Sequence, residues 1–220
     1  MSEEDKALVQ VDALPPAKYT DEQFALATKT GDWLPRLQLM TANSKNVAEG
    51  KFPMNHYALI NGQNLQDVGD VVDILVLSWR PKAIEMDDEV ITVFDPEHPE
   101  FQRIQDKSEG QDSGCMFGPE YLVWIPSVRE FATFFMGSKS ARREAPGVKS
   151  RLLQAATLKS HTVKTKKYTW QVPTCIACST PFDPPDQDSI NEQIEKFNNP
   201  PETDIQRVSE EEKEATTRAR

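Results

Sequence analysis

Short apolar runs that are rich in β-branched and aromatic residues constrain the fold of this chain most. The clearest run is residues 71–79, VVDILVLSW, and others follow at residues 89–94, 121–125 and 131–136. Each run has the length and composition of a β-strand, and Pro, Gly, Asn or Asp residues separate the runs. The chain is therefore expected to form mainly β-structure.

The expected strands differ in how they end. The last two of these runs flank a Pro126-Ser127 break and predict a β-hairpin. The first run is expected to bend or end at Arg80-Pro81, because proline lacks an N–H for the strand ladder. Residues 158–172 are expected to return to strand as one element.

Three stretches favour helix. The polar stretch that ends near Gly110 has helical character. Residues 141–156 carry apolar side chains at spacings of three and four, although Pro146-Gly147 is expected to confine the regular helix to the residues after it. A short amphipathic helix is expected near residues 188–197, between two proline-containing segments.

These elements predict a mainly β (α+β) fold, a small OB-like β-barrel with one or two short helices and disordered acidic termini. The oligonucleotide-binding (OB) fold is a five-stranded barrel that binds single strands, and it often carries a helix between strands three and four. We expect a mobile N-terminal arm at residues 1–32, the barrel domain at 33–180, and an acidic, largely disordered tail at 181–220 that includes the short helix.

Charge is segregated along the chain. Residues 138–171 hold nine Lys or Arg against one Glu, a formal charge of +8. The whole chain carries −10, which leaves −18 for the remaining residues. A basic island in an acidic chain is typical of a surface that binds a polyanion, and nucleic acid is the first candidate.

One segment of this island combines cations with aromatic rings. In a strand over residues 163–171, every second side chain points to the same face. One face would then carry two cations and two rings: Lys164, Lys166, Tyr168 and Trp170. Ammonium groups would neutralise phosphates while the rings stack on bases, as single-strand binding requires. The alternative is that both rings lie in the core while the lysines form an ordinary solvated edge.

Two further clusters extend the candidate surface. Trp79 lies beside two cations at a strand end, and Phe135 precedes a basic stretch that follows a Gly-Ser turn. Both rings have a core position as the alternative. The candidate nucleic-acid-binding residues outside the face described above are Lys139, Arg142, Arg143, Lys167, Trp79, Arg80, Lys82 and Phe135.

Cysteines and acids raise the question of a metal site. Cys175 and Cys178 have the spacing of a zinc knuckle or a redox dithiol, but structural zinc needs four ligands and no second paired motif lies near them. Two unlinked thiols are the preferred interpretation. A run of acids could bind a divalent cation, although a solvated turn is the preferred interpretation: Glu85, Asp87, Asp88, Glu89 and Asp95.

Enzyme and membrane signals are missing from the sequence. It has no phosphate-binding Gly-rich loop, no Gly-x-Ser-x-Gly elbow and no His-Glu-x-x-His, so we predict a protein that is not an enzyme and has no cofactor. The longest apolar stretches fall far below the roughly 20 residues of a membrane span, and the N-terminus lacks the apolar core of a signal peptide. We expect a cytoplasmic protein with reduced cysteines and no membrane partner.

The basic-aromatic β-domain, followed by the acidic stretch of residues 183–214, resembles the single-stranded DNA-binding proteins that bacteriophages encode for replication and recombination. The resemblance implies an OB barrel that binds single-stranded DNA without sequence specificity, in the host cell cytoplasm. It also implies that the acidic tail contacts replication or recombination proteins and competes with DNA for the basic groove. The chain ends in TTRAR, whereas typical tails end in acidic residues. Phe197 on the short helix is therefore the better anchor for a partner.

Two other classes of function stay open. A structural or assembly protein of a virion, or a protein interaction module, would use the basic island to dock on acidic surfaces of sister subunits in a homo-oligomer. A metal-dependent nuclease would use the acidic run to hold its metal.

Overall fold

The computed structural model describes the chain from Leu34 to Arg207, as one compact unit with five short gaps. The described residues are 34–62, 64–86, 89–110, 114–180, 182–199 and, for the backbone alone, 203–207. The expected N-terminal arm at residues 1–32 and the final residues of the expected tail lie outside these ranges.

Ten strands and four helices make up the described part of the chain. The strands are β1 (Arg36–Leu39), β2 (Tyr57–Asn61), β3 (Asn64–Gly69), β4 (Val72–Met86), β5 (Glu89–Val93), β6 (Cys115–Ile125), β7 (Glu130–Phe135), β8 (Ala155–Lys164), β9 (Thr169–Ala177) and β10 (Thr203–Arg207). The helices are α2 (Lys45–Ala48), α3 (Pro99–Glu109), α4 (Lys139–Lys149) and α5 (Gln187–Asn198).

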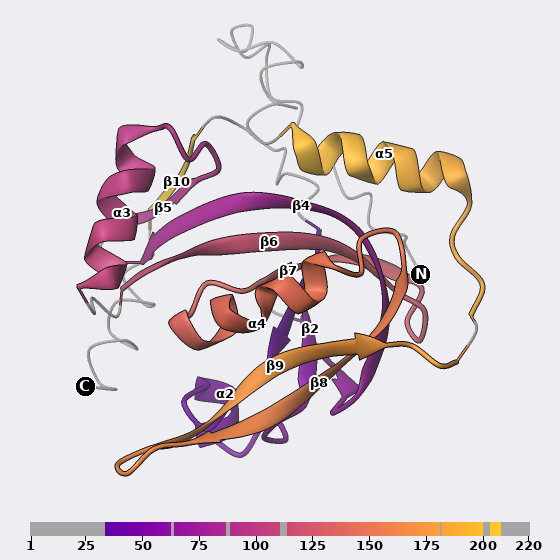
Figure 1. Ribbon diagram of the computed structural model, residues 1–220, viewed down its shortest axis with the longest axis horizontal. Coiled ribbons are helices and arrows are strands. Elements are labelled where there is room, and N and C mark those ends of the chain that lie inside the picture. Colours follow the sequence, from indigo (N-terminus) through magenta and orange to yellow (C-terminus); the bar gives the residue numbers. More distant parts are fainter. Residues whose placement is uncertain are drawn as a thin grey trace, which may run out of the picture. The chain divides into compact units, whose positions relative to one another are not determined.

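All ten strands belong to one curled sheet. Its main path runs β10-β5-β4-β6-β7-β1-β2-β3, while β8 pairs with the start of β4 and β9 pairs with β8. Every pairing is antiparallel except that between β1 and β7. The long strands β4 and β6 lie side by side and bend strongly (Figure 1). The sheet thus forms a half-barrel, and the prediction of a mainly β fold is confirmed.

The largest hydrophobic cluster lies on the face of the sheet that α4 covers. Ala141, Ala145 and Val148 of α4 pack there against residues of β1, β2, β4, β6, β7 and β8. The hydroxyl group of Tyr57 on β2 donates a hydrogen bond of 2.8 Å to the carbonyl oxygen of Lys159 on β8. This bond brings the two distant arms of the curled sheet together across the core.

The opposite face of the sheet is covered by α5 (Figure 1). Ile190, Ile194 and the buried Phe197 form the apolar stripe of this helix. The stripe packs on Leu77 of β4 and on Leu122 and Trp124 of β6, in a separate hydrophobic cluster. The helix expected near residues 188–197 is therefore confirmed, and it folds onto the sheet.

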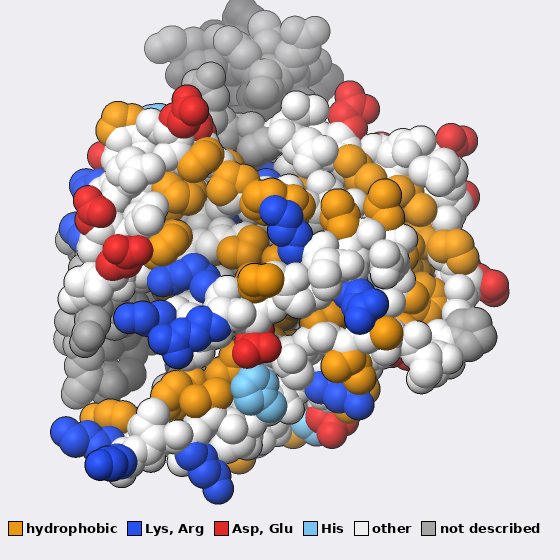
Figure 2. Space-filling view, viewed as in Figure 1, with side chains coloured by type: hydrophobic (Ala, Val, Ile, Leu, Met, Phe, Trp, Pro, Cys, Tyr) orange, Lys and Arg blue, Asp and Glu red, His pale blue; other side chains and the backbone are white. Residues whose placement is uncertain are grey.

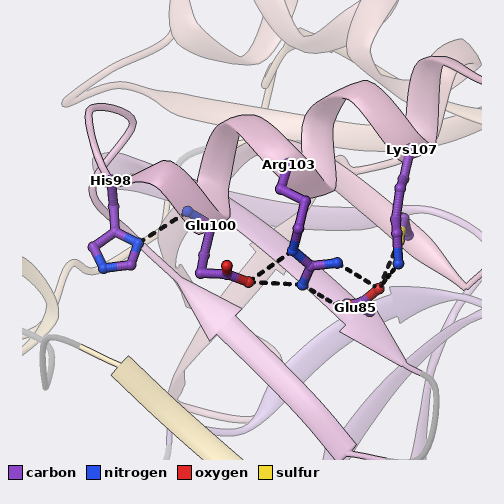
Figure 3. Close-up of polar contacts among 6 residues, drawn as sticks. Glu85, His98, Glu100, Arg103 and Lys107 are labelled. Carbon is purple, nitrogen blue, oxygen red and sulfur yellow. Dashed lines mark hydrogen bonds and ion pairs between the residues drawn. The ribbon is translucent and has the colours of Figure 1, made fainter.

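Helix α3 is fastened to β4 by an ion cluster (Figure 3). Arg103 and Lys107 project from one side of the helix to the buried carboxylate of Glu85, with Arg103 Nη1 at 3.0 Å and Lys107 Nζ at 2.5 Å from Oε1. Hydrogen bonds from Arg103 and Lys107 lower the pKa of Glu85 to about 2. Glu85 therefore keeps its charge throughout the physiological range.

The structure confirms some of the expected elements and corrects others. The hairpin of β6 and β7, the strand at residues 89–94 and the helix before Gly110 are confirmed. Arg80-Pro81 does not end the strand, because β4 continues to Met86 with Pro81 directly opposite Pro119 of β6. Two residues that lack an N–H thus share one position of the ladder.

Helix α4 also differs from expectation. It begins at Lys139, because the Ser138 side chain caps its N-terminus by accepting a hydrogen bond from the N–H of Ala141. The helix then continues through Pro146 and ends at Lys149. Strand β10 lies inside the tail that we expected to be largely disordered, where it pairs with β5.

Candidate nucleic-acid interface

Residues 158–172 form a hairpin rather than one strand, so the shared face predicted for residues 164, 166, 168 and 170 is wrong. Strand β8 ends at Lys164 and β9 begins at Thr169. Thr165 closes the turn: its N–H donates to the carbonyl oxygen of Tyr168 at 2.8 Å, and its Oγ1 accepts from the N–H of Tyr168 at 3.0 Å. The polar KTKK run has no apolar side chain to bury, so a turn is the favoured conformation.

The hairpin tip gathers three cations and one ring in solvent. Lys164, Lys166 and Lys167 are exposed, and none forms an ion pair with a described residue. The side chain of Tyr168 is 71% exposed, so it is not part of the core. The tip therefore presents positive charge and a free aromatic face together, although by a different local structure from the one predicted.

Trp170 joins the hairpin to α4. It is half-buried, and its Nε1–H donates a hydrogen bond of 3.0 Å to Oγ of Ser140 in the first turn of the helix. The ring thus has a fixed orientation at the boundary between β9 and α4. Ser140 was not among the predicted residues, and no pattern in the sequence pointed to it.

The N-terminal half of α4 adds cations close to Trp170. Lys139 and Arg143 are exposed, and neither forms an ion pair with a described residue. The first turn of α4 holds no acid. Cations at a helix N-terminus oppose the helix dipole, so helix stability does not explain them. The backbone N–H groups and these side chains instead favour an anion at this end.

Arg142 has a structural role that the sequence did not reveal. Its Nη1 donates to the carbonyl oxygens of Phe117 at 3.0 Å and Gly137 at 2.6 Å, and its guanidinium lies 3.8 Å from the centre of the Phe117 ring. Burial lowers the pKa of Arg142. This side chain holds α4 against β6, and its guanidinium already has hydrogen-bond and aromatic partners within the protein.

We call the surface formed by the hairpin tip and the start of α4 the hairpin patch. Blue Lys and Arg side chains gather over these two elements on one side of the molecule, with hydrophobic side chains between them (Figure 2). The patch consists of Lys139, Arg143, Lys164, Lys166, Lys167, Tyr168 and Trp170. Of the predicted binding residues, the structure thus brings these seven together.

Trp79 lies at the other end of α4. Its side chain is 39% exposed, and the Lys149 Nζ atom lies 4.4 Å from the centre of its ring. This cation–π contact covers one side of the indole at the C-terminal end of the helix. Trp79 is therefore neither a core residue nor a member of the hairpin patch.

Arg80 and Lys82 lie on the opposite face, under α5. Both bond to Glu120 of β6, whose side chain is only 1% exposed: Arg80 Nη2 is 2.7 Å from Oε2, and Lys82 Nζ is 2.7 Å from Oε1. We call these three residues the buried triad. Both cations are already ion-paired there, so they differ from the free cations of the hairpin patch.

Aromatic rings enclose the buried triad. The Arg80 guanidinium lies 3.9 Å from the ring centre of Phe94 and 4.1 Å from that of Phe197 on α5. Lys82 Nζ lies 5.2 Å from the ring centre of Phe135, which is half-buried. Sequence reasoning missed the partners Glu120, Phe94 and Phe197, although an isolated acid before the apolar run at 121–125 was a usable signal for a buried ion pair.

Of the cysteines and acids considered for a metal site, the side chains of Cys175, Cys178, Glu85 and Asp95 are described, whereas Asp87, Asp88 and the side chain of Glu89 lie outside the described part of the chain. Cys175 and Cys178 are free thiols, and burial raises the pKa of Cys175 to about 11. Glu85 belongs to the ion cluster of α3, and Asp95 accepts a hydrogen bond from the N–H of Glu97 in a turn. Within the described ranges, no group of three or more His, Cys, Asp or Glu could hold a metal ion.

The chain matches no family model, no curated protein and no solved structure. Among the described helices, none is long and apolar enough to cross a membrane.

Proposed function

We propose that this protein binds single-stranded DNA without sequence specificity through the hairpin patch, in DNA replication or recombination. The observation that carries the proposal is the exposed ring of Tyr168 among three lysines that pair with no described acid. Cations of this kind neutralise phosphates, and an exposed ring stacks on any base. A chain with a net charge of −10 would otherwise repel DNA, so a local concentration of free cations is informative.

The connectivity supports an OB-type barrel as the finer fold assignment. If β4 is taken as the first barrel strand, β6 and β7 are the second and third, α4 is the helix that follows, and β8 is the fourth. The segment β5–α3 is then an insertion between the first two strands. The N-terminal strand β1 lies parallel to β7, beside the third barrel strand.

This assignment gives the hairpin tip a recognised position. The turn between β8 and β9 corresponds to the loop after the fourth strand, one of the two loops that OB folds use to bind oligonucleotides. The tip is also where the free cations and the exposed ring occur. Topology and surface chemistry therefore both favour the hairpin tip as the segment that binds DNA.

Tryptophan fluorescence tests the proposal. Titration with an oligothymidine at low salt should quench part of the emission through Trp170, and the affinity should fall as salt rises. Tyr168→Ala should weaken binding by roughly 1–3 kcal/mol, the contribution of one base stacked on a ring. Its melting temperature should stay unchanged because the side chain is exposed. A protein that shows no quenching and no retention of a labelled oligonucleotide at low salt would refute the proposal.

A role in protein assembly is the second candidate. Leu153 is 67% exposed and has a left-handed backbone conformation with φ of 59°, which is unfavourable for leucine. An exposed apolar side chain on a strained turn fits a contact with another protein subunit. Light scattering on the purified chain distinguishes the candidates: a large, ordered oligomer without DNA affinity supports assembly.

Contacts between residues 181–220 and replication or recombination proteins form a further part of the proposal. Phe197 does not serve as a free anchor in the described structure, because its ring is 2% exposed and lies on Arg80. A partner that engages Phe197 would first have to lift α5 from the sheet.

A further inference from the structure

A polar cavity lies on the part of the sheet formed by β1, β2 and β3. Its volume is about 740 Å³, within the range of roughly 300–1,000 Å³ that ligand pockets occupy. It shares no residue with the hairpin patch or with the buried triad. The lining residues are Arg36, Gln38, Met40, Thr41, Asn43, Ser44, Lys45, Asn46, Ile60, Gly62, Asn64 and Leu65.

The local sequence explains why the cavity forms. Ser44 Oγ accepts a hydrogen bond of 3.0 Å from the N–H of Thr41, which folds residues 41–44 into a turn beside β1. Gly62 has φ of 57° in the tight connection between β2 and β3, a conformation that favours glycine. The two turns stand at opposite ends of β1, since Arg36 lies opposite Ile60 and Leu39 lies opposite Tyr57, and residues of both turns line the cavity.

The chemistry of the lining is unusual for such an acidic chain. Among the described residues that line the cavity, two are cations and none is a carboxylate. Neither Arg36 nor Lys45 forms an ion pair with a described residue. Glu120 acts on Arg36 electrostatically, but its oxygens are already bonded to Arg80 and Lys82. Two cations that form no ion pair with a described residue, and no carboxylate among the described lining residues, favour an anionic ligand.

The remaining lining residues fit a base and a sugar. Four side-chain amides make no hydrogen bond with a described residue: Gln38, Asn43, Asn46 and Asn64. An amide offers a donor and an acceptor together, and it pairs with the edge of adenine through two hydrogen bonds. Met40, Ile60 and Leu65 belong to a small apolar cluster beneath the cavity and supply a surface for a flat ring.

We propose that this cavity binds a nucleoside monophosphate unit, with Arg36 and Lys45 on the phosphate and the amides on the base. The ligand is either a free mononucleotide or one nucleotide of a nucleic acid strand, since both present the same groups. The site does not depend on DNA binding by the hairpin patch, because the two surfaces have separate residues and charges.

Calorimetry on the full chain tests the site. The probes are the four deoxynucleoside 5′-monophosphates, deoxyadenosine and inorganic phosphate. We expect one saturable site for a mononucleotide, with deoxyadenosine and phosphate each binding at least about tenfold more weakly, because each lacks one half of the contacts. Absence of saturable binding for all four mononucleotides, or equal binding of phosphate alone, overturns the proposal.

Substitutions in the cavity lining test whether the mononucleotide binds there. Arg36→Gln and Lys45→Gln should each weaken mononucleotide binding about tenfold, since each loses one charge-assisted contact. Lys45 is exposed at the start of α2, so its variant stays informative if Arg36→Gln folds poorly. Lys51→Gln is the control, because it removes an exposed charge that pairs with Glu49 outside the cavity. Mononucleotide binding that survives both cavity variants overturns the proposal.

Two further comparisons separate this site from the hairpin patch and identify the source of the ligand. Lys166→Gln/Lys167→Gln should leave mononucleotide binding unchanged; a loss there would assign the ligand to the hairpin and overturn the proposal. Competition between the mononucleotide and an oligonucleotide in the same double variant would identify a nucleotide of a strand as the ligand. Independent binding of the two would identify a free mononucleotide.

Discussion

The hairpin patch and the buried triad contain the same kinds of residues in opposite states. In the hairpin patch, Lys164, Lys166 and Lys167 are exposed and pair with no described acid. In the buried triad, Arg80 and Lys82 are about 15% exposed and both bond to a carboxylate that is almost completely buried. Aromatic rings accompany the cations in both places.

The difference between the two regions comes from one acid and one helix. Glu120 forms ion pairs with both cations, and α5 places the Phe197 ring over Arg80, so the charges of the buried triad serve packing between the sheet and α5. No comparable acid or helix covers the described residues of the hairpin tip. A cluster of cations and aromatic rings is therefore a binding surface only where its charges are left unpaired.

The largest effect should come from breaking the buried triad. Glu120→Gln leaves two cations in a largely buried position without a countercharge, and such a loss destabilises a protein by roughly 3–5 kcal/mol. Urea unfolding of both proteins measures this difference. Glu49→Gln is the matched control, because Glu49 pairs with Lys51 at the surface, and its substitution should change stability far less than Glu120→Gln. Equal stabilities for the two variants would remove the distinction between the regions.

The second effect is a loss of stability at low pH, which the ion cluster between α3 and Glu85 should cause. The pKa of Glu85 is about 2 in the folded protein because Arg103 and Lys107 bond to the charged form, whereas its ordinary value is 4.5. The resulting stabilisation, roughly 2–3 kcal/mol, is complete above about pH 4.5 and is lost as the pH falls toward 2. Unfolding midpoints between pH 2 and pH 7 measure it. In Glu85→Gln this part of the pH dependence should vanish; an unchanged profile would contradict the assignment.

The third effect sharpens the role of the hairpin patch. Lys166→Gln/Lys167→Gln should weaken oligothymidine binding roughly tenfold at low salt and reduce the salt slope by about 1.4, since two phosphate contacts are lost. Stability should stay within about 0.5 kcal/mol because both side chains are exposed. Lys51→Gln/Lys196→Gln changes the net charge equally outside the patch and serves as the control. If both double variants lose the same affinity, only the overall charge matters.

Composition and periodicity predicted the parts of this structure that depend on neighbouring residues. The mainly β class, the β6–β7 hairpin and α5 all follow from local runs of apolar side chains. The basic island of residues 138–171 contains the cations of the hairpin patch, but residues 164–170 do not form one alternating strand, because the side chain of Thr165 closes a turn there. Local patterns cannot reveal how a residue is used when its partner is distant in sequence.

The buried triad illustrates that limit. Arg80 and Glu120 are 40 residues apart, and Phe197 lies 117 residues from Arg80. From the sequence, Arg80 and Lys82 were a second candidate for phosphate contacts, after the lysines of residues 164–167. The pairing of β4 with β6 brings Arg80 and Lys82 to Glu120, and α5 packs over the sheet on that side. Neither contact can be read from the local sequence.

The smallest effect tests whether Trp170 contacts DNA, as proposed for the hairpin patch, or only packs within the protein, as the rings of the buried triad do. Ser140→Ala removes the acceptor of its indole N–H, which should cost about 1 kcal/mol of stability and alter its fluorescence. Ser150→Ala, at the other end of α4, removes a hydroxyl that bonds to the Gly147 carbonyl oxygen at the surface, and it serves as the control. If the fixed ring also contacts DNA, Ser140→Ala should weaken oligothymidine binding beyond the control. A stability loss with unchanged affinity would make Trp170 a packing residue and leave Tyr168 as the described ring of the patch that stacks on a base.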